Sequence, residues 1–294
     1  SAKNAWCVIK LWPLLKKEVE IKKFILDGAS VELTRNEQGK FNFGDPLSLL
    51  TEQSSSRLFK LLGASLMHRL SVLDSEVKFR DYYGVSGSEP LLTVINGINL
   101  SVNKRFFQNA FSFNLNGRIP NKYQTTVFEF SGGIDNFKNV KRNQPIPLKG
   151  KIKVDQLHLD QLRPYLKKIL PIVSDDTKLS LETDISGSLG GKLRAKGGLK
   201  YSRVVMGQKP VLSTIDSLGE GEIEYALQLD KNSIEIQSLK ATSGQSSFSG
   251  NGKFIDYQTK DPRLSFTIQS DEFKIGKAHR NFPLLFFPES IHKK

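Results

Sequence analysis

The sequence predicts a mostly β protein with a few short helices, in which antiparallel strands follow one another as a meander. Short segments along the whole chain alternate apolar and polar residues with a period of two, which is typical of strands with one buried face. Gly, Asn, Asp and Ser separate these segments, as turns require. Hydrophobic residues make up 38% of the 294 residues, enough to form a substantial apolar core or face.

The first half of the chain contains six predicted strands. Residues 18–26 and 29–34 flank Asp27-Gly28, a dipeptide typical of tight hairpin turns because it tolerates positive φ. The other four strands are residues 72–80, 92–102, 111–119 and 125–130. We therefore expect a hairpin at Asp27-Gly28, followed by a series of separate strands.

The alternation is cleaner in the second half, where each predicted strand places its apolar residues on one face. These residues are Leu179, Leu181 and Ile185; Leu193, Ala195 and Leu199; Ile223, Tyr225, Leu227 and Leu229; Ile234 and Ile236; Phe248 and Phe254; and Leu264, Phe266 and Ile268. Residues 187–191 are Gly-rich but lack the Lys-Ser/Thr ending of a phosphate-binding loop, so they predict a hairpin turn between the first two series.

Two segments have the spacing of amphipathic helices. In residues 57–67, Leu58, Leu61, Leu62 and Leu66 follow helical spacing after three serines that could cap the helix. Residues 159–170 carry a second apolar stripe, with a proline in the first turn and Pro171 at the end. We expect these helices to cover an end or edge of the sheet; the alternative is that they lie on a membrane, with their basic residues towards the headgroups.

We expect two β modules, residues 1–145 with the helix near 57–67 and residues 146–294, whose sheets are continuous. The second module contains a weak internal repeat. Its apolar pattern recurs after 116 residues, from Ile152, Leu157, Leu159 and Leu162 to Ile268, Phe273, Ile275 and Ala278. Such a repeat would extend one sheet unit by unit, each unit covering the edge of its neighbour.

The formal net charge of +13 favours anionic partners such as lipid headgroups, lipopolysaccharide phosphates or nucleic acid. Basic residues occur only in short pairs such as Lys16-Lys17, so nothing resembles a nucleic-acid-binding tail, and we expect no nucleic-acid partner. Cys7 is the single cysteine, which excludes an internal disulfide. No apolar run approaches the ~20 residues of a membrane-spanning helix.

Residues 11–43, LWPLLKKEVEIKKFILDGASVELTRNEQGKFNF, resemble the N-terminal signature of the AsmA family. The matching features are the Leu-rich segment around Pro13, Glu20-Ile21, Leu26-Asp27-Gly28, Val31-Glu32-Leu33, and Gly39 followed by Phe41-Asn42-Phe43. The chain departs from the family at Ala29, where members commonly have Pro, and at Phe43, where they have Trp.

The resemblance implies a periplasmic segment of a protein anchored in the bacterial inner membrane by a helix upstream of residue 1. It also implies kinship with bridge-like lipid transfer proteins, whose strands curl into a half-pipe with an apolar concave face, the β-groove. Alternation alone is equally compatible with a closed β-sandwich, so that architecture stays open as the alternative. Ten residues are candidates for lining a lipid groove: Phe111, Phe113, Leu115, Ile223, Tyr225, Leu227, Ile234, Ile236, Phe266 and Ile268.

The sequence lacks the motifs of known catalytic and metal sites. His68, His158, His279 and His292 are isolated, and Asp175-Asp176 is better explained as a loop than as an acid–base pair. A Gly-x-Ser-x-Gly nucleophile elbow is also missing. We therefore expect a non-enzymatic protein with no catalytic residues, cofactor or metal.

Three functional hypotheses follow. The first is binding or shuttling of phospholipid, or another acyl-chain lipid, for outer-membrane homeostasis. The alternative is a non-catalytic envelope scaffold or assembly factor that acts through protein partners. The third is binding of an anionic polymer, motivated by the net charge.

Overall fold

The computed structural model describes residues 1–17, 20–43, 67–83, 89–105, 110–135, 145–160, 177–189, 191–202, 204–206, 216–218, 220–243, 246–256 and 263–270. Strands dominate these residues, and the named helix is short, α1 (Leu11–Leu14). The strands are β1 (Asn4–Ile9), β2 (Ile21–Asp27), β3 (Ser30–Arg35), β4 (Met67–Asp81), β5 (Leu91–Arg105), β6 (Ala110–Ile119), β7 (Thr126–Ile134), β8 (Ile146–His158), β9 (Lys178–Leu189), β10 (Leu193–Tyr201), β11 (Val204–Met206), β12 (Asp216–Leu218), β13 (Gly221–Leu229), β14 (Ser233–Ser243), β15 (Ser246–Ile255) and β16 (Arg263–Ser270).

Hydrogen-bonded neighbours give the main sheet the strand order β1-β2-β4-β5-β6-β7-β8-β9-β10-β13-β14-β15-β16. Strand β3 belongs to the same sheet and pairs with β4. Strands β11 and β12 form a separate antiparallel pair. Most neighbours in the order are consecutive in the chain, so the predicted mostly β meander is confirmed. The sheet is open and single, in place of the alternative closed sandwich, and an open sheet is compatible with the predicted half-pipe.

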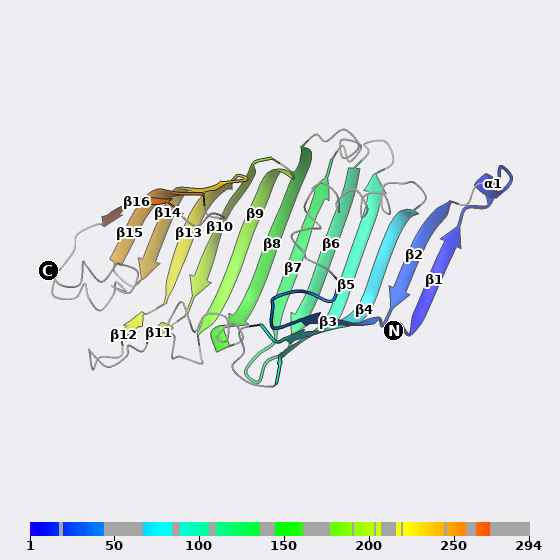
Figure 1. Cartoon of the computed structure of the whole chain (residues 1–294), viewed down its shortest axis with the longest axis horizontal. Helices are drawn as coiled ribbons and strands as arrows, with labels where there is room; N and C mark the ends of the chain where they lie inside the picture. Colours follow the sequence, from blue (N-terminus) through cyan, green and yellow to red (C-terminus); the bar gives the residue numbers. More distant parts are fainter. Residues whose placement is uncertain are drawn as a thin grey trace. The chain divides into compact units, whose positions relative to one another are not determined.

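The described residues form two compact units. The first comprises residues of Ser1–Gln156, Glu182–Ala195 and Gln228–Lys231, and the second comprises residues of Leu157–Leu181, Lys196–Leu227 and Asn232–Lys294. Figure 1 labels the strands of each unit; β4 to β8 of the first run from cyan to green. The division into modules 1–145 and 146–294 stays a prediction.

The hairpin expected at Asp27-Gly28 is wrong. Strands β2 and β3 do not pair with each other; both lie parallel to β4, with Ile21 opposite Met67 and Arg35 opposite Asp81. The offset between the paired residues is the same along both strands, so β2 and β3 are one extended segment interrupted at Gly28. Gly28 adopts the positive φ that the sequence indicated (58°), but it makes a kink and not a reversal.

The kink at Gly28 continues across the neighbouring strands. Asp74 of β4 and Gly97 of β5 also have positive φ, and the pairing register shifts beside both residues. The hydroxyl of Ser75 accepts a hydrogen bond from the Ala29 N–H (3.0 Å), and Asn99 Oδ1 accepts one from the Asp74 N–H (3.1 Å). Bulges of this kind bend strands locally, and these side chains satisfy the N–H groups left out of the ladder.

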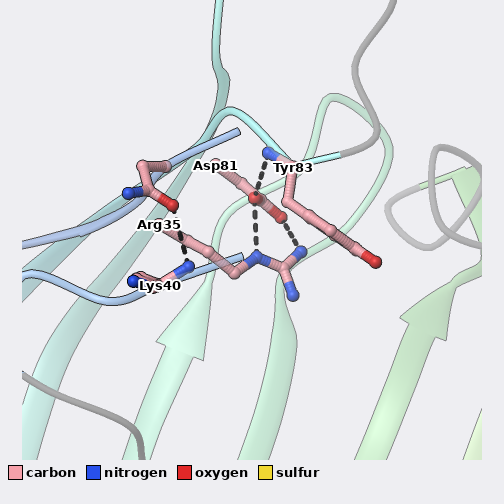
Figure 2. A network of polar contacts seen from close by, with 5 residues as sticks. Arg35, Lys40, Asp81 and Tyr83 are labelled. Carbon is pink, nitrogen blue, oxygen red and sulfur yellow. Dashed lines mark hydrogen bonds and ion pairs between the residues drawn. The ribbon is translucent and has the colours of Figure 1, made fainter. Parts of the chain in front are cut away.

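An ion pair joins β3 to β4 at the end of their parallel ladder (Figure 2). Arg35 Nε donates to Asp81 Oδ1 (2.8 Å), Arg35 Nη2 pairs with Asp81 Oδ2, and the Tyr83 N–H donates to Oδ1 (2.9 Å). The Asp81 side chain is fully buried, and that of Arg35 is 20% exposed. The guanidinium also lies 4.8 Å from the ring centroid of Tyr83 and 5.7 Å from that of Phe41.

The remaining local predictions have mixed outcomes. The turn predicted at residues 187–191 does connect neighbouring strands: β9 ends at Leu189, β10 begins at Leu193, and the Ser188 N–H donates to the Lys192 carbonyl (3.0 Å), while residue 190 lies outside the described residues. The helix near 57–67 lies outside the described residues except for Met67, which begins β4. The second helix is described only at Leu159 and Asp160, which are helical. Of the repeat's second copy, only Ile268 is described, in β16.

Candidate functional site

The register of β4 to β8 brings most of the large apolar residues of these strands to one side of the sheet. Leu70 pairs with Val102, Leu115 with Phe130, and Phe130 with Ile152. Directly paired residues point to the same side of a sheet, so these rows form one continuous surface. We call it the apolar face of the first unit; it comprises Leu70, Val72, Val77, Phe79, Ile95, Ile98, Leu100, Val102, Phe111, Phe113, Leu115, Phe128, Phe130, Ile134, Leu148, Ile152 and Val154.

A chain of side-chain hydrogen bonds crosses the opposite, polar face. Asn99 Nδ2 donates to Asn116 Oδ1 (3.2 Å), and Asn116 Nδ2 donates to Asn114 Oδ1 (3.2 Å). Asn114 Nδ2 then donates to Glu129 Oε1 on β7 (3.0 Å). A slip of one residue would turn these side chains to the apolar side, so the hydrogen bonds favour the register that keeps the apolar residues together.

The polar face continues onto β9 through an ion pair. Lys151 Nζ lies 2.5 Å from Glu182 Oε1, and this hydrogen bond raises the pKa of Lys151. Both side chains are about half exposed, so the pair adds little stability. The ion pair does show which side of β9 each residue occupies. Glu182 lies on the polar face, so Leu181 and Ile185 lie on the opposite side of the strand.

Phenylalanine rings cover glycines on the apolar face of the first unit. A Cβ added to Gly117 would lie 2.6 Å from Phe128 Cζ, and one added to Gly132 would lie 2.8 Å from Phe113 Cζ. The rings therefore lie along the sheet, above glycines of the neighbouring strands. Phe113 also contacts Phe130, with ring centroids 4.9 Å apart. These flat rings leave an even apolar surface.

Replacing Gly132 by alanine is expected to destabilise the protein by about 1–3 kcal/mol. The added Cβ would overlap the Lys149 carbonyl oxygen and lie 2.8 Å from the Gly150 Cα, so β7 and β8 would have to separate. The matched control is Gly133→Ala, whose Cβ would meet only the Phe111 carbonyl oxygen, at 3.2 Å. Urea unfolding of both variants checks the prediction, and equal losses would contradict it.

Strands β14 to β16 of the second unit show the same division into faces. Ile234 pairs with Phe254 and Phe254 with Leu264, while charged and polar residues such as Lys253 occupy the alternate positions. The apolar face of the second unit comprises Ile234, Ile236, Leu239, Ala241, Phe248, Phe254, Leu264, Phe266 and Ile268. The Phe266 ring again lies over a glycine, 3.3 Å from where a Cβ on Gly250 would be.

Strand β13 presents its apolar residues opposite a polar row. Glu222 Oε1 lies 3.9 Å from Lys200 Nζ of β10, and Gln228 Oε1 accepts a hydrogen bond from Arg194 Nε (3.4 Å). Glu222 and Gln228 therefore share the polar side of β13. The alternate positions, Ile223, Tyr225 and Leu227, lie together on the other side.

The structure groups the ten predicted lining residues by strand. Phe111, Phe113 and Leu115 lie on the apolar face of the first unit. Ile234, Ile236, Phe266 and Ile268 lie on that of the second unit, and Ile223, Tyr225 and Leu227 share one side of β13. Their role in lining a lipid site stays a prediction.

Sequence reasoning missed several residues of the same surface. Phe128 and Phe130 of β7 alternate in the sequence and are paired directly with β6, so their own periodicity could have identified them. Leu70, Val102 and Ile152 carry the same signal, but only the register shows that they lie in the same cross-strand rows as Phe113 and Leu115.

The apolar faces are only partly buried. Among the described residues, the hydrophobic residues that are buried are Ala29, Ala110, Phe111, Ile146 and Leu159. Phe113 and Leu115 are half-buried, and Phe266 is 39% exposed. Within the described ranges, the strands with extensive mutual contact are sheet neighbours. A sealed core between two sheets would bury these side chains fully.

Glu20 lies between two basic side chains where the chain enters β2. Its carboxylate lies 3.2 Å from Lys10 Nζ and 3.0 Å from His68 Nε2. The hydrogen bonds with His68 and then Lys10 lower the pKa of Glu20 below its ordinary value of 4.5. The two contacts fix the end of β1 to β2 and β4.

Glu20→Gln is expected to weaken the acid sensitivity of the fold. A carboxylate with a lowered pKa stabilises the folded state above its ordinary pKa, and this contribution is lost as the pH falls through the lowered value. The variant should therefore lose less stability than the parent chain between neutral pH and about pH 3. Urea unfolding across this range checks it, with Glu37→Gln in an exposed turn as the control. Parallel stability curves for parent and Glu20→Gln would refute it.

In the described part of the chain, no group of three or more His, Cys, Asp or Glu side chains is placed to hold a metal ion. The helices in those same ranges are too short or too polar to cross a bilayer. His158 is buried and His68 contacts Glu20, whereas His279, His292 and Asp175-Asp176 lie outside the described residues.

Comparison of the chain with family models, curated proteins and solved structures found no significant match.

Proposed function

We propose that this chain binds phospholipid, or another acyl-chain lipid, along the apolar faces of its open sheet. We further propose that it is a periplasmic segment of an inner-membrane-anchored, AsmA-like envelope protein that shuttles lipid for outer-membrane homeostasis. The observation that carries the first proposal is the register of β4 to β8, which aligns apolar side chains of five strands on one side.

The size of the hydrophobic effect explains why such a face would be useful. Exposing an acyl chain to water costs ~0.8 kcal/mol per methylene, or about 11 kcal/mol for fourteen methylenes. An apolar face that covers the chain offsets much of this cost, while the charged headgroup stays in water. The flat rings of Phe113, Phe128 and Phe130 provide contact area without filling the space above the sheet.

The polar face would remain in water. It carries the Asn99–Asn116–Asn114–Glu129 hydrogen bonds and the Lys151–Glu182 ion pair. This division of the sheet into two chemically different sides matches an amphiphilic ligand on one side and solvent on the other. A scaffold that acts through protein partners would not require an accessible apolar side of this kind.

The direct test is whether the chain carries lipid. The chain is produced in bacteria, purified without detergent, and analysed by native mass spectrometry and by extraction of bound lipid. We expect phospholipid at a reproducible stoichiometry, with exchange for added fluorescent phospholipid. A purified chain that retains no lipid and takes up none would overturn the proposal and favour the scaffold alternative.

A further inference from the structure

The segment that leads out of the edge strand β1 is strongly apolar and exposed. Leu11, Trp12 and Leu15 are 78%, 76% and 76% exposed, and Ile9 and Leu14 are also exposed. We call Ile9, Leu11, Trp12, Leu14 and Leu15 the N-terminal tip. Figure 1 shows α1, in blue, beyond the ends of β1 and β2. Clustered large apolar side chains on a surface commonly mark an interaction site.

The backbone of this segment is ordered by its own hydrogen bonds. The Leu15, Lys16 and Lys17 N–H groups donate to the carbonyls of Trp12, Pro13 and Leu14, at 3.3, 2.9 and 3.0 Å. At its base, the Lys10 N–H donates to the Glu20 carbonyl (2.9 Å), beside the Lys10–Glu20 ion pair. The tip is thus held out from the sheet by contacts at its base.

Exposed lysines adjoin the apolar side chains. Lys16 and Lys17 follow Leu15 directly and are exposed, and the whole chain has a net charge of +13. Tryptophan and leucine partition into the boundary between headgroups and acyl chains, where lysines can reach anionic headgroups. This combination of charge and apolarity fits an anionic bilayer surface.

We infer that the N-terminal tip inserts into the surface of an anionic lipid bilayer, with Trp12, Leu11 and Leu15 among the acyl chains and Lys16 and Lys17 at the headgroups. This contact places the β1 end of the first unit against a membrane. It does not depend on lipid binding by the apolar faces, because the tip is separate from the residues that form those faces.

The chain supplies its own reporter for the test. Trp6 and Trp12 are its two tryptophans, so Trp6→Phe leaves Trp12 alone in the tip. The Trp6→Phe chain is mixed with phosphatidylcholine vesicles with or without phosphatidylglycerol, and flotation and Trp12 fluorescence are recorded. We expect flotation, a blue shift and quenching by brominated acyl chains with the anionic vesicles, weakening as salt is added.

Further substitutions in the Trp6→Phe chain test whether the N-terminal tip, and not another surface, binds the vesicles. Leu11→Asp/Leu15→Asp should lower the vesicle partition coefficient at least about tenfold, and Lys16→Glu/Lys17→Glu should lower it about tenfold or more on anionic vesicles. Leu92→Asp, an exposed apolar residue on the polar face, is the matched control and should leave partitioning unchanged.

Two results would overturn the inference. The first is a Trp12 emission that does not change on anionic vesicles. The second is partitioning that survives Leu11→Asp/Leu15→Asp but is lost in Phe113→Asp, which would assign vesicle binding to the apolar face. Retention of vesicle binding by Phe113→Asp, together with loss of extractable lipid, would support the tip contact and the proposed lipid site independently.

Discussion

Arg35→Met is expected to destabilise the first unit by about 3 kcal/mol or more, because it removes the guanidinium that pairs with the buried Asp81 carboxylate. Asp81 has no exposed side-chain surface and accepts hydrogen bonds from Arg35 and the Tyr83 N–H. The substitution also removes the contact of the guanidinium with the Tyr83 ring. Urea unfolding of the variant measures the loss.

The same two strands provide the matched control for this prediction. Arg80 and Glu32 also join β4 to β3, 2.7 Å apart, but their side chains are 43% and 53% exposed. Glu32→Gln should therefore change stability by less than about 1 kcal/mol. Arg35→Met/Asp81→Asn should recover part of the loss, since the buried charge is gone and an amide oxygen can still accept from Tyr83. Equal losses of unfolding free energy in Arg35→Met and Glu32→Gln would show that the burial of Asp81 does not increase the cost of removing its ion pair.

Phe113→Asp is expected to reduce lipid binding by the first unit about ten- to two-hundredfold. Phe113 is half-buried near the middle of the apolar face, between Val102 of β5 and Gly132 of β7. A carboxylate there would remove contact worth about two to four methylenes, at about 0.8 kcal/mol each. Titration with a fluorescent phospholipid measures the affinity, and circular dichroism with urea unfolding measures folding.

The control for Phe113→Asp is its neighbour in the chain. Ser112 lies in the same strand on the polar face, paired with Asn103 and Gly133. Ser112→Asp should leave lipid binding within about twofold of the parent chain, since it removes no apolar contact. Leu115→Gln serves as a milder apolar-face variant if Phe113→Asp fails to fold. Equal loss of binding in Ser112→Asp and Leu115→Gln would contradict a lipid site on the apolar face.

Period-two alternation was sufficient to predict many of the strands and their apolar sides. Ile234 and Ile236 of β14 lie on one face in the structure, as do Phe266 and Ile268 of β16, in agreement with their spacing. The reason is geometric, because successive side chains of a strand point to opposite sides whatever its partner. The same geometry places Phe111, Phe113 and Leu115 on one face of β6.

The sequence did not predict which strands far apart in the chain pair with each other. Asp27-Gly28 has the composition of a hairpin turn, yet β2 and β3 both lie parallel to β4. Glycine with positive φ suits a bulge as well as a reversal, and the choice is made by the partner strand, which begins at Met67. The Arg35–Asp81 pair was missed for the same reason, since only this parallel register brings the two residues together.

Photo-crosslinking along β6 tests the central claim most directly. A photoreactive amino acid is placed in turn at positions 112 to 116, and the folded chain is loaded with phospholipid and irradiated. Crosslinks to the acyl chain should form from positions 113 and 115 and be lacking from 112, 114 and 116, following the two sides of the strand. Crosslinks of equal yield from both sides, or from neither, would contradict lipid binding on the apolar face.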